Sequence, residues 1–224
     1  FDSELNDVSS RVMEMGGLVE SQLRLAIYAL SQFSTESASQ VIDTEMRVNT
    51  MEIDIDRELS SIIARRQPTA RDLRLLIAIS KTTANLERAG DEADKIARMV
   101  KSIIESGEAR ALPSSELRIA GELASGLLRK ALDAFARLDT TAAVSILKED
   151  NQIDQEFDGF VRKLITYMME DPRTISASLD LLFVSQAIAR VGDHAKNIAE
   201  FIIYIVKGAD VRHSPMAQVE SAVR

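Results

Sequence analysis

The sequence contains no cysteine and no tryptophan, and it has only two histidines. Without cysteine the chain can form neither disulfides nor thiolate metal sites, and thiolate catalysis is excluded. Two histidines, His194 and His213, cannot supply a site rich in imidazole ligands within one chain. Metal ligands, if there are any, must therefore come mainly from carboxylates. The lack of cysteine also fits a cytoplasmic location.

Long apolar runs and an excess of positive charge are absent as well. The most apolar stretch, Phe201–Val206, is six residues long, far below the ~18 apolar residues typical of a membrane span. The formal net charge of −8 argues against nucleic acid as a partner, because phosphates attract basic surfaces. We find no nucleophile–base pair, glycine-rich phosphate loop or zinc signature. Composition and spacing alone therefore point to a metal-binding or scaffolding protein.

Prolines are few, and they divide the chain into long segments. Pro68, Pro113, Pro172 and Pro215 are separated by stretches rich in Ala, Leu, Ile, Glu, Arg and Lys, which are good helix formers. Proline interrupts a helix, and no strand-like alternation of apolar and polar residues is visible. The sequence predicts an all-α protein with six long helices, at about 4–33, 38–66, 70–106, 114–138, 140–170 and 173–207.

The two halves of the chain repeat one another. Residues 86–100 read LERAGDEADKIARMV and residues 188–202 read IARVGDHAKNIAEFI, with six identical positions at an offset of 102. The same offset aligns Asp56 with Asp158. Because short connections make successive helices antiparallel neighbours, we expect two pseudo-symmetric antiparallel three-helix bundles, side by side or end to end. The expected divisions are a first bundle at 1–107, a linker at 108–113, a second bundle at 114–208 and a C-terminal tail at 209–224.

Acidic residues interrupt an apolar face in both halves. Steps of four and three trace one face of a helix. On the second predicted helix these steps select Ala38, Ile42, Glu45, Asn49, Glu52, Asp56, Leu59 and Ile63. On the fifth they select Val144, Leu147, Asn151, Asp154, Asp158, Val161 and Ile165. Burying unpaired carboxylates costs several kcal/mol each, so a cation at each polar patch would be stabilising.

The predicted hairpins bring acids of neighbouring helices to one height. Counting outward from the turn at Pro68 places Glu45 level with about Asp91, and in the second half Asp193 falls within a turn of Asn151. Helical bundles bind metals through carboxylates projected from facing helices in this way. Oxygen ligands suit Mg²⁺, Ca²⁺ or Mn²⁺, and can also serve Fe or Zn. Solvated acidic faces are the alternative, and the residues alone leave both interpretations open.

Five segments together resemble the PhoU family of phosphate-transport accessory proteins. They are Met13-Glu-Met-Gly-Gly17, Arg65-Arg-Gln-Pro-Thr-Ala70, Leu86-Glu-Arg-Ala-Gly-Asp91, Tyr167-Met-Met-Glu-Asp171 and Arg190-Val-Gly-Asp-His194. The resemblance covers nearly the whole chain. It implies a cytoplasmic, non-catalytic negative regulator of the phosphate-starvation response and of phosphate uptake. Such a regulator connects the ATPase of the phosphate ABC transporter to a sensor histidine kinase, and it is usually a homodimer or larger oligomer.

The resemblance also implies metal sites built from paired E/D-x-x-x-D motifs, with iron or zinc in some members. The acids that match these motifs are Glu52, Asp56, Glu87, Asp91, Asp154, Asp158 and Asp193. Ala189 stands where the last motif should have an acid, so we expect the second site to be weaker, incomplete or dependent on another ligand. The metal stays open among Fe, Zn, Mg and Mn. Two other functions also stay open: a bundle metalloenzyme of the phosphohydrolase or oxidase type, and a metal-free structural dimer.

Overall fold

The computed structural model describes residues 2–107, 112–149 and 151–224, and all regular structure within them is helical. This confirms the all-α prediction. The helices in chain order are α1 (Asp2–Gln32), α2 (Thr35–Arg66), α3 (Ala70–Ser106), α4 (Ser115–Arg137), α5 (Thr140–Glu149), α6 (Asn151–Glu170), the 3₁₀ turn η2 (Pro172–Thr174), α7 (Ile175–Lys207) and α8 (Met216–Val223).

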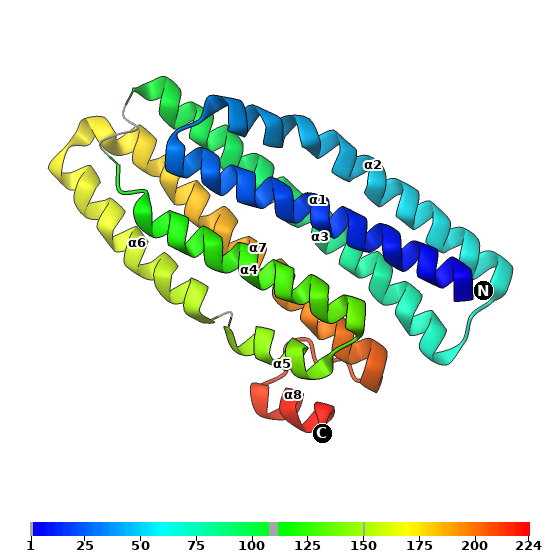
Figure 1. Cartoon of the computed structure of the whole chain (residues 1–224). Helices are drawn as coiled ribbons and strands as arrows, with labels where there is room; N and C mark the ends of the chain where they lie inside the picture. Colours follow the sequence, from blue (N-terminus) through cyan, green and yellow to red (C-terminus); the bar gives the residue numbers. More distant parts are fainter. Residues whose placement is uncertain (1, 108–111, 150) are drawn as a thin grey trace.

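The long helices run side by side in two groups (Figure 1). Helices α1, α2 and α3 pack on one another, as do α4, α5, α6 and α7. The two groups meet laterally, with α3 against α7 and α1 against α4. The expected fifth helix appears as two segments, α5 and α6, on either side of residue 150, which lies outside the described residues. Most of the expected linker, residues 108–111, also lies outside them, and the short helix α8 has no counterpart among the six predicted helices.

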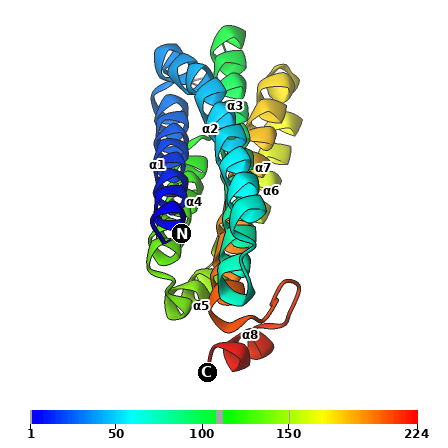
Figure 2. The ribbon, with the colours of Figure 1, turned by 90° about the vertical axis from the view of Figure 1, so that its right-hand side faces the viewer.

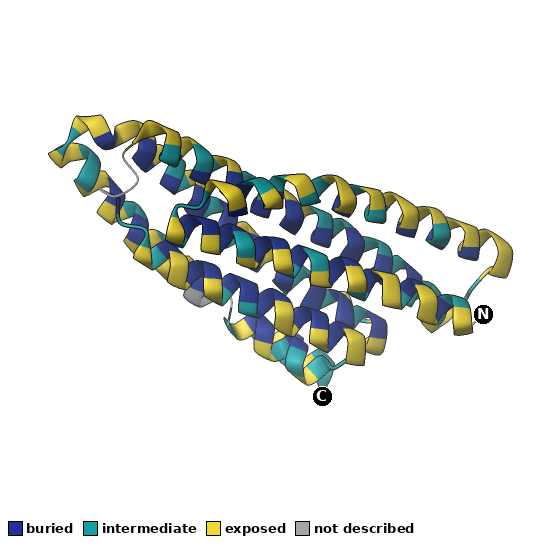
Figure 3. Ribbon diagram, turned by 45° about the horizontal axis from the view of Figure 1, so that its top comes forward, coloured by how far each residue is buried: buried dark blue, intermediate teal, exposed yellow. Residues whose placement is uncertain are grey.

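The apolar core is continuous across both groups. Figure 3 shows that buried positions lie on the inward faces of the helices and exposed positions on the outside. On α1, for example, Val8, Val12, Met15 and Val19 are fully buried at steps of three or four, which is the period of one helix face. Buried apolar side chains of both halves belong to one cluster. The bundles are therefore joined by a shared core.

Two glycines permit the close contact of α1 with α4. A Cβ atom on Gly121 would lie 2.3 Å from Cδ1 of Ile27, and one on Gly16 would lie 2.5 Å from Cδ2 of Leu132. Contacts at these distances are far inside van der Waals separation, so larger side chains would push the helices apart. Gly16 in the first half of α1 meets Leu132 near the end of α4, whereas Ile27 near the end of α1 meets Gly121 near the start of α4. These helices are therefore antiparallel.

Polar contacts join α3 to α7. The Nδ2 of Asn197 donates to Oδ1 of Asn85 at 3.0 Å, Arg190 pairs with Glu92 at 3.5 Å, and Ser102 donates to Asp180 at 2.7 Å. In each of these pairs the two residue numbers add up to 282. The repeat equivalents Gly90 and Gly192 share that total, which places them at the middle of the antiparallel contact. The pseudo-twofold axis that relates the halves therefore passes beside the repeated glycine.

The segment Pro172–Lys207 is long and apolar enough to cross a membrane by length and composition alone. Half of its most apolar window is buried within the protein, and α7 contacts α3, α4, α5 and α6. A buried core helix has the same composition as a membrane span, so this segment is weak evidence for a span. The packing accounts for its buried apolar residues, whereas Ile175, Leu179, Phe183 and Val206 are exposed.

Candidate metal centre

Three carboxylates from two helices converge in the first half of the molecule. Glu45 projects from α2, and Glu87 and Asp91 project from α3, with one oxygen of each lying within 4.8 Å of the others. Glu87 and Asp91 are one helical turn apart and so share a face. Counting residues from the turn at Pro68 predicted that Glu45 and Asp91 lie at about the same height along the bundle, and this arrangement agrees with that prediction. Together these side chains offer an all-oxygen ligand set of the kind that hard cations prefer.

A glutamine of α1 and a glycine of α3 shape the inner wall of this cluster. Gln22 is only 2 % exposed, and its Nε2 donates to Oε2 of Glu45 at 3.1 Å and to the carbonyl of Val41 at 3.3 Å. A Cβ atom on Gly90 would lie 3.1 Å from Oε1 of Gln22 and 3.4 Å from Oε2 of Glu45. The glycine thus leaves room for two polar side chains beside the helix backbone.

Several oxygens of the cluster and of neighbouring side chains are buried without a hydrogen-bond donor from any described residue. They are Oε1 of Gln22, Oε1 of Glu45, Oδ1 of Asn49 and Oδ1 of Asp94. Buried polar atoms are normally hydrogen-bonded, and an acceptor left without a partner costs roughly 1–3 kcal/mol. All four atoms are hydrogen-bond acceptors, so a cation can interact favourably with them, whereas a further acceptor cannot. The residues present therefore fit a bound metal ion.

The cluster shifts the pKa values of its carboxyl groups upward. Burial, followed by hydrogen bonding and repulsion from Asp91, raises the pKa of Glu45 to about 7 against the opposing hydrogen bond from Gln22. Burial and then repulsion from Asp91 and Glu52 raise the pKa of Glu87 to about 7. The pKa of Glu52 is also raised, mainly by burial and then by Asp56 and Asp91. In the absence of a cation the group therefore resists full ionisation near neutral pH.

Only some of the predicted metal ligands of the first half lie close to one another. Glu87 and Asp91 lie in the trio, and Glu52 is close enough to both to interact electrostatically. Asp56 is exposed, and one of its oxygens accepts a hydrogen bond from Ser80 at 3.1 Å. The third member of the trio is Glu45, which belongs to the acidic stripe of α2 but not to the family motifs. The stripe and the height count were the signals that pointed to it.

The second half has no equivalent trio among the residues that the structure describes. Asp154 and Asp158 of α6 and Asp193 of α7 are all exposed. The pKa of Asp193 is raised by burial and then by the charge of Asp154, which places these two carboxylates within electrostatic reach. Asp158 has no hydrogen bond or ion pair with any described residue. Ala189 packs against the core.

His194 is a packed residue between the halves and not part of the trio. Its Nδ1 lies 3.0 Å from Oδ1 of Asn85, an atom that can only accept, so Nδ1 is the protonated nitrogen. Burial and the nearby charges of Arg88 and Arg190 lower the pKa of His194 to about 4. The imidazole is therefore neutral near pH 7 and links α7 to α3.

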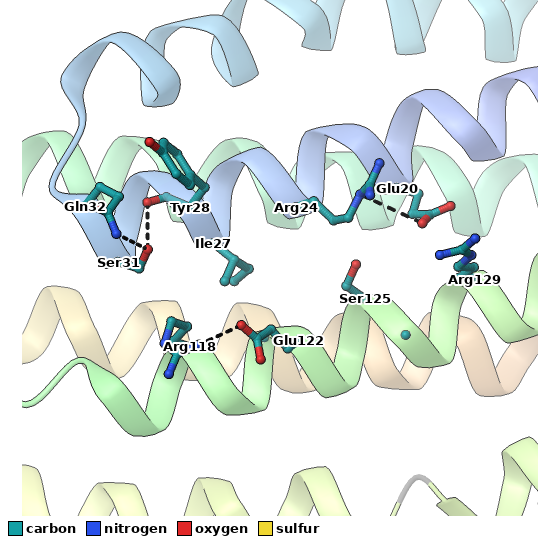
Figure 4. A pocket seen from close by; sticks show the side chains of 12 residues that line it. Glu20, Arg24, Ile27, Tyr28, Ser31, Gln32, Arg118, Glu122, Ser125 and Arg129 are labelled. Atoms are coloured by element: carbon teal, nitrogen blue, oxygen red, sulfur yellow. Dashed lines mark hydrogen bonds and ion pairs between the residues drawn. The ribbon is translucent and has the colours of Figure 1, made fainter.

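A separate groove lies between α1 and α4 (Figure 4). Its volume is about 570 Å³, and Ile27 and Gly121 contribute to its lining. Arg24 approaches Glu20 at 3.9 Å, and Arg118 pairs with Glu122 at 3.0 Å. These pairs flank the close crossing of the two helices. The groove combines apolar and charged surface but gathers no set of metal ligands.

The fold and the trio define a duplicated all-α protein with a carboxylate cluster in one of its two bundles. The PhoU domain matches residues 12–100 and 117–202, one match in each half. The chain therefore belongs to the PhoU family, and the two matches agree with the internal repeat.

Relatives and solved structures agree with this assignment. The chain is 49 % identical over 225 residues to a phosphate-specific transport system accessory protein PhoU homolog of Burkholderia sp, covering 100 % of this chain and 96 % of the relative. It is 48 % identical to the PhoU of Escherichia coli K12, covering 95 % of this chain and 88 % of that protein. The crystal structure of PhoU from Pseudomonas aeruginosa superposes with a TM-score of 0.87 at 44 % identity, covering 93 % of this chain and 100 % of that one. The crystal structure of the phosphate transport system regulatory protein PhoU from Streptococcus pneumoniae superposes with a TM-score of 0.86 at 28 % identity, covering 94 % of this chain and 99 % of that one.

Proposed function

We propose that this protein is a cytoplasmic, non-catalytic negative regulator of phosphate uptake and of the phosphate-starvation response. It acts as an adaptor between the ATPase of the phosphate ABC transporter and its sensor histidine kinase. The single observation that carries this proposal is the PhoU match in both halves of the chain, supported by relatives named as accessory proteins of phosphate-specific transport. Contact with the membrane is made through these partners, and the adaptor acts as a homodimer.

A metal ion bound by Glu45, Glu87 and Asp91 has a structural role in this proposal. A divalent or trivalent cation, among Fe, Zn, Mg and Mn, supplies the positive charge that three converging carboxylates lack. Because the ligands come from α2 and α3, the ion braces those two helices against each other. Glu52 and Asp56 lie along the same face of α2 and extend the acidic surface outward. Asp154, Asp158 and Asp193 form a weaker, more exposed acidic surface in the second half.

Capture of the two partners tests the adaptor role. The immobilised full-length protein is exposed to detergent-solubilised membranes that contain the transporter and the kinase, with and without phosphate in the growth medium. We expect the ATPase and the kinase to be retained together from phosphate-replete cells. A control column carrying an unrelated acidic helical protein measures non-specific retention. Failure to retain either partner above that control would refute the adaptor role.

Elemental analysis tests the metal site independently of the partners. Protein purified without chelators should contain about one equivalent of metal per chain, and Glu87→Ala should contain much less. Asp158→Ala is the matched control, since it removes an exposed carboxylate outside the trio. Equal metal content in all three proteins, or none in any, would refute the assignment of the trio as a metal site.

A further inference from the structure

A hollow of about 580 Å³ lies where α3, α7 and the segment after α7 come together. Its walls include Lys81 and Arg88 from α3, Lys196 and Asn197 from α7, and residues 212–214 from the segment before α8. Figure 2 shows this segment looping out beside the base of the bundles before α8 begins. The hollow thus draws its walls from both halves of the molecule. We call it the α3–α7 hollow.

The α3–α7 hollow is basic in a protein whose net charge is −8. Five of its lining side chains carry nitrogen groups that are or can become cationic: Lys81, Arg88, Lys196, Arg212 and His213. Two carboxylates, Asp193 and Glu200, share the lining. Arg212 is also held by Asp210, with Nε 2.9 Å from Oδ1. Lys81 and Arg88 form no ion pair with any carboxylate among the described residues, and the ammonium group of Lys81 lies 5.8 Å from the centre of the Phe201 ring, which also lines the hollow.

The cationic groups of the lining outnumber its two carboxylates. Glu200 is half-buried, and Lys196 and His213 act on it electrostatically. The balance of the hollow therefore favours an anion over a cation.

The polar wall of the hollow is held in a fixed arrangement. Asn85 is 5 % exposed; its Nδ2 donates to the carbonyl of Lys81 at 2.8 Å, and its Oδ1 accepts from Asn197 at 3.0 Å. The same Oδ1 atom lies 3.0 Å from Nδ1 of His194. These contacts fix the helices that present Lys81 and Lys196, and recognition of a small polar ligand requires such rigid supporting elements.

The internal repeat shows that the two lysines of the hollow are not repeated at the other end of the α3–α7 contact. At the offset of 102, Lys81 corresponds to Phe183, and Lys196 corresponds to Asp94. Arg88, by contrast, is repeated as Arg190. The lysine pair therefore distinguishes this end of the contact from its pseudo-symmetric counterpart.

We propose that the α3–α7 hollow binds a phosphate-class oxyanion, either inorganic phosphate or the phosphoryl group of a larger ligand. Lysine and arginine are the usual ligands of such anions, and charge-assisted hydrogen bonds are about twice as strong as neutral ones. Since the ligand contacts both α3 and α7, its binding energy depends on how the two bundles are placed. Binding of the anion would thereby favour one arrangement of the two bundles, and that arrangement is what the partners recognise. This regulatory consequence rests on the proposed function, whereas the binding site does not.

Calorimetric titration of the full-length, chelator-treated protein with inorganic phosphate tests the proposal without interference from a bound metal. The test variant is Lys81→Ala/Lys196→Ala, which removes one cation from each helix. The matched control is Lys101→Ala/Lys207→Ala, which removes the same charges from the same two helices outside the hollow. We expect at least a tenfold weaker affinity in the test variant, and an affinity within twofold of the unmodified protein in the control. Circular dichroism melts confirm that both variants fold.

Further titrations identify the source of the anion. Tighter binding of ATP or pyrophosphate than of inorganic phosphate, with the same dependence on Lys81 and Lys196, assigns the site to the phosphoryl group of a larger ligand. Absence of heat with all three anions at millimolar concentration overturns the proposal. Equal weakening in the test and control variants also overturns it, since that pattern indicates non-specific attraction. Neither result affects partner capture, so failure of this site is distinguishable from failure of the adaptor role.

Discussion

The two halves of this protein share a backbone plan but differ in the polar seam between their helices. In the first half Gln22, Glu45, Glu87 and Asp94 surround or form the carboxylate cluster. At the repeat offset of 102 these positions are occupied in the second half by Ala124, Leu147, Ala189 and Lys196. Ala124 and Leu147 are buried core residues. The two halves therefore share their helical plan, whereas three of these four polar positions carry alanine or leucine in the second half and the fourth carries lysine.

This difference shows what a repeated motif does and does not specify. Asp91 and Asp193 occupy equivalent positions, yet only Asp91 faces two other carboxylates. At the positions equivalent to Glu45 and Glu87, the second half has Leu147 and Ala189, which offer no ligand atom. The cluster around the aspartate thus depends on acids from its own helix and from the facing helix together.

Removal of a ligand from the trio should have the largest effect. Glu87→Ala should weaken Mn²⁺ binding on the order of 100-fold, because it removes a direct ligand and even second-shell changes cost 10–100-fold. Asp193→Ala, at a motif position of the second half, should leave that affinity within about threefold. Isothermal titration of chelator-treated protein measures both. Similar losses in the two variants would show that the halves bind metal alike.

The contact between the halves can be disturbed through one glycine of α4. Gly121→Ala should lower the free energy of unfolding by about 1–2 kcal/mol, because overpacking against Ile27 exceeds the gain in helix propensity. The control is Gly126→Ala on the same helix, where an added Cβ meets no atom within 4 Å. The control should stabilise the protein by up to about 1 kcal/mol. Urea unfolding followed by circular dichroism gives both values, and equal changes would argue against a tight α1–α4 contact.

The pH dependence of stability should reveal the acidic seam of the first half. Glu45 and Glu87 have pKa values of about 7 in the folded protein, against about 4.3 in an unfolded chain. A raised folded pKa means that the protonated form is favoured by folding, so this stabilisation is fully present below the unfolded pKa and is lost as pH rises through 7. The metal-free protein should therefore be more stable at pH 5.5 than at pH 8, by on the order of 1 kcal/mol after allowance for solvent screening.

A double substitution separates this pH effect from other titrations. Glu45→Gln/Glu87→Gln should flatten the dependence of stability on pH between about 5.5 and 8, because neither group then titrates. Thermal melts at several pH values, in the presence of a chelator, provide the measurement. If the variant keeps the full slope of the unmodified protein, the trio is not its cause.

Restoring the missing acid of the second half should have the smallest effect. Ala189→Glu completes the motif around Asp193, but Leu147 still occupies the place that Glu45 has in the first half. We expect no second tight equivalent of Mn²⁺, and at most weak additional binding, because Leu147 supplies no ligand atom to complete a trio of carboxylates. Ala189→Gln is the uncharged control. A second equivalent with the affinity of the first would show that the motif alone is sufficient.

Much of the fold could be predicted from residue patterns. Helix formers between widely spaced prolines indicated the long helices, and the LERAGDEA-like repeat indicated the duplication. The height count from Pro68 brought Glu45 level with Asp91, because the rise of a helix is regular and the turn is short. Motif matching favoured Glu52 and Asp56 as ligands, whereas Glu45 lies in the trio with Glu87 and Asp91.

The amino-acid sequence by itself determined the helices, the duplication and the heights of the acids, because these follow from local propensity and from the fixed rise per residue. Only the tertiary structure decided which side chains meet across helices that are distant in the chain. The contact of Gln22 with Glu45, and the presence of Lys81 and Lys196 in the lining of one hollow, depend on how the helices rotate and cross as the shared core packs. That geometry results from the summed burial of many side chains, and no local pattern records it.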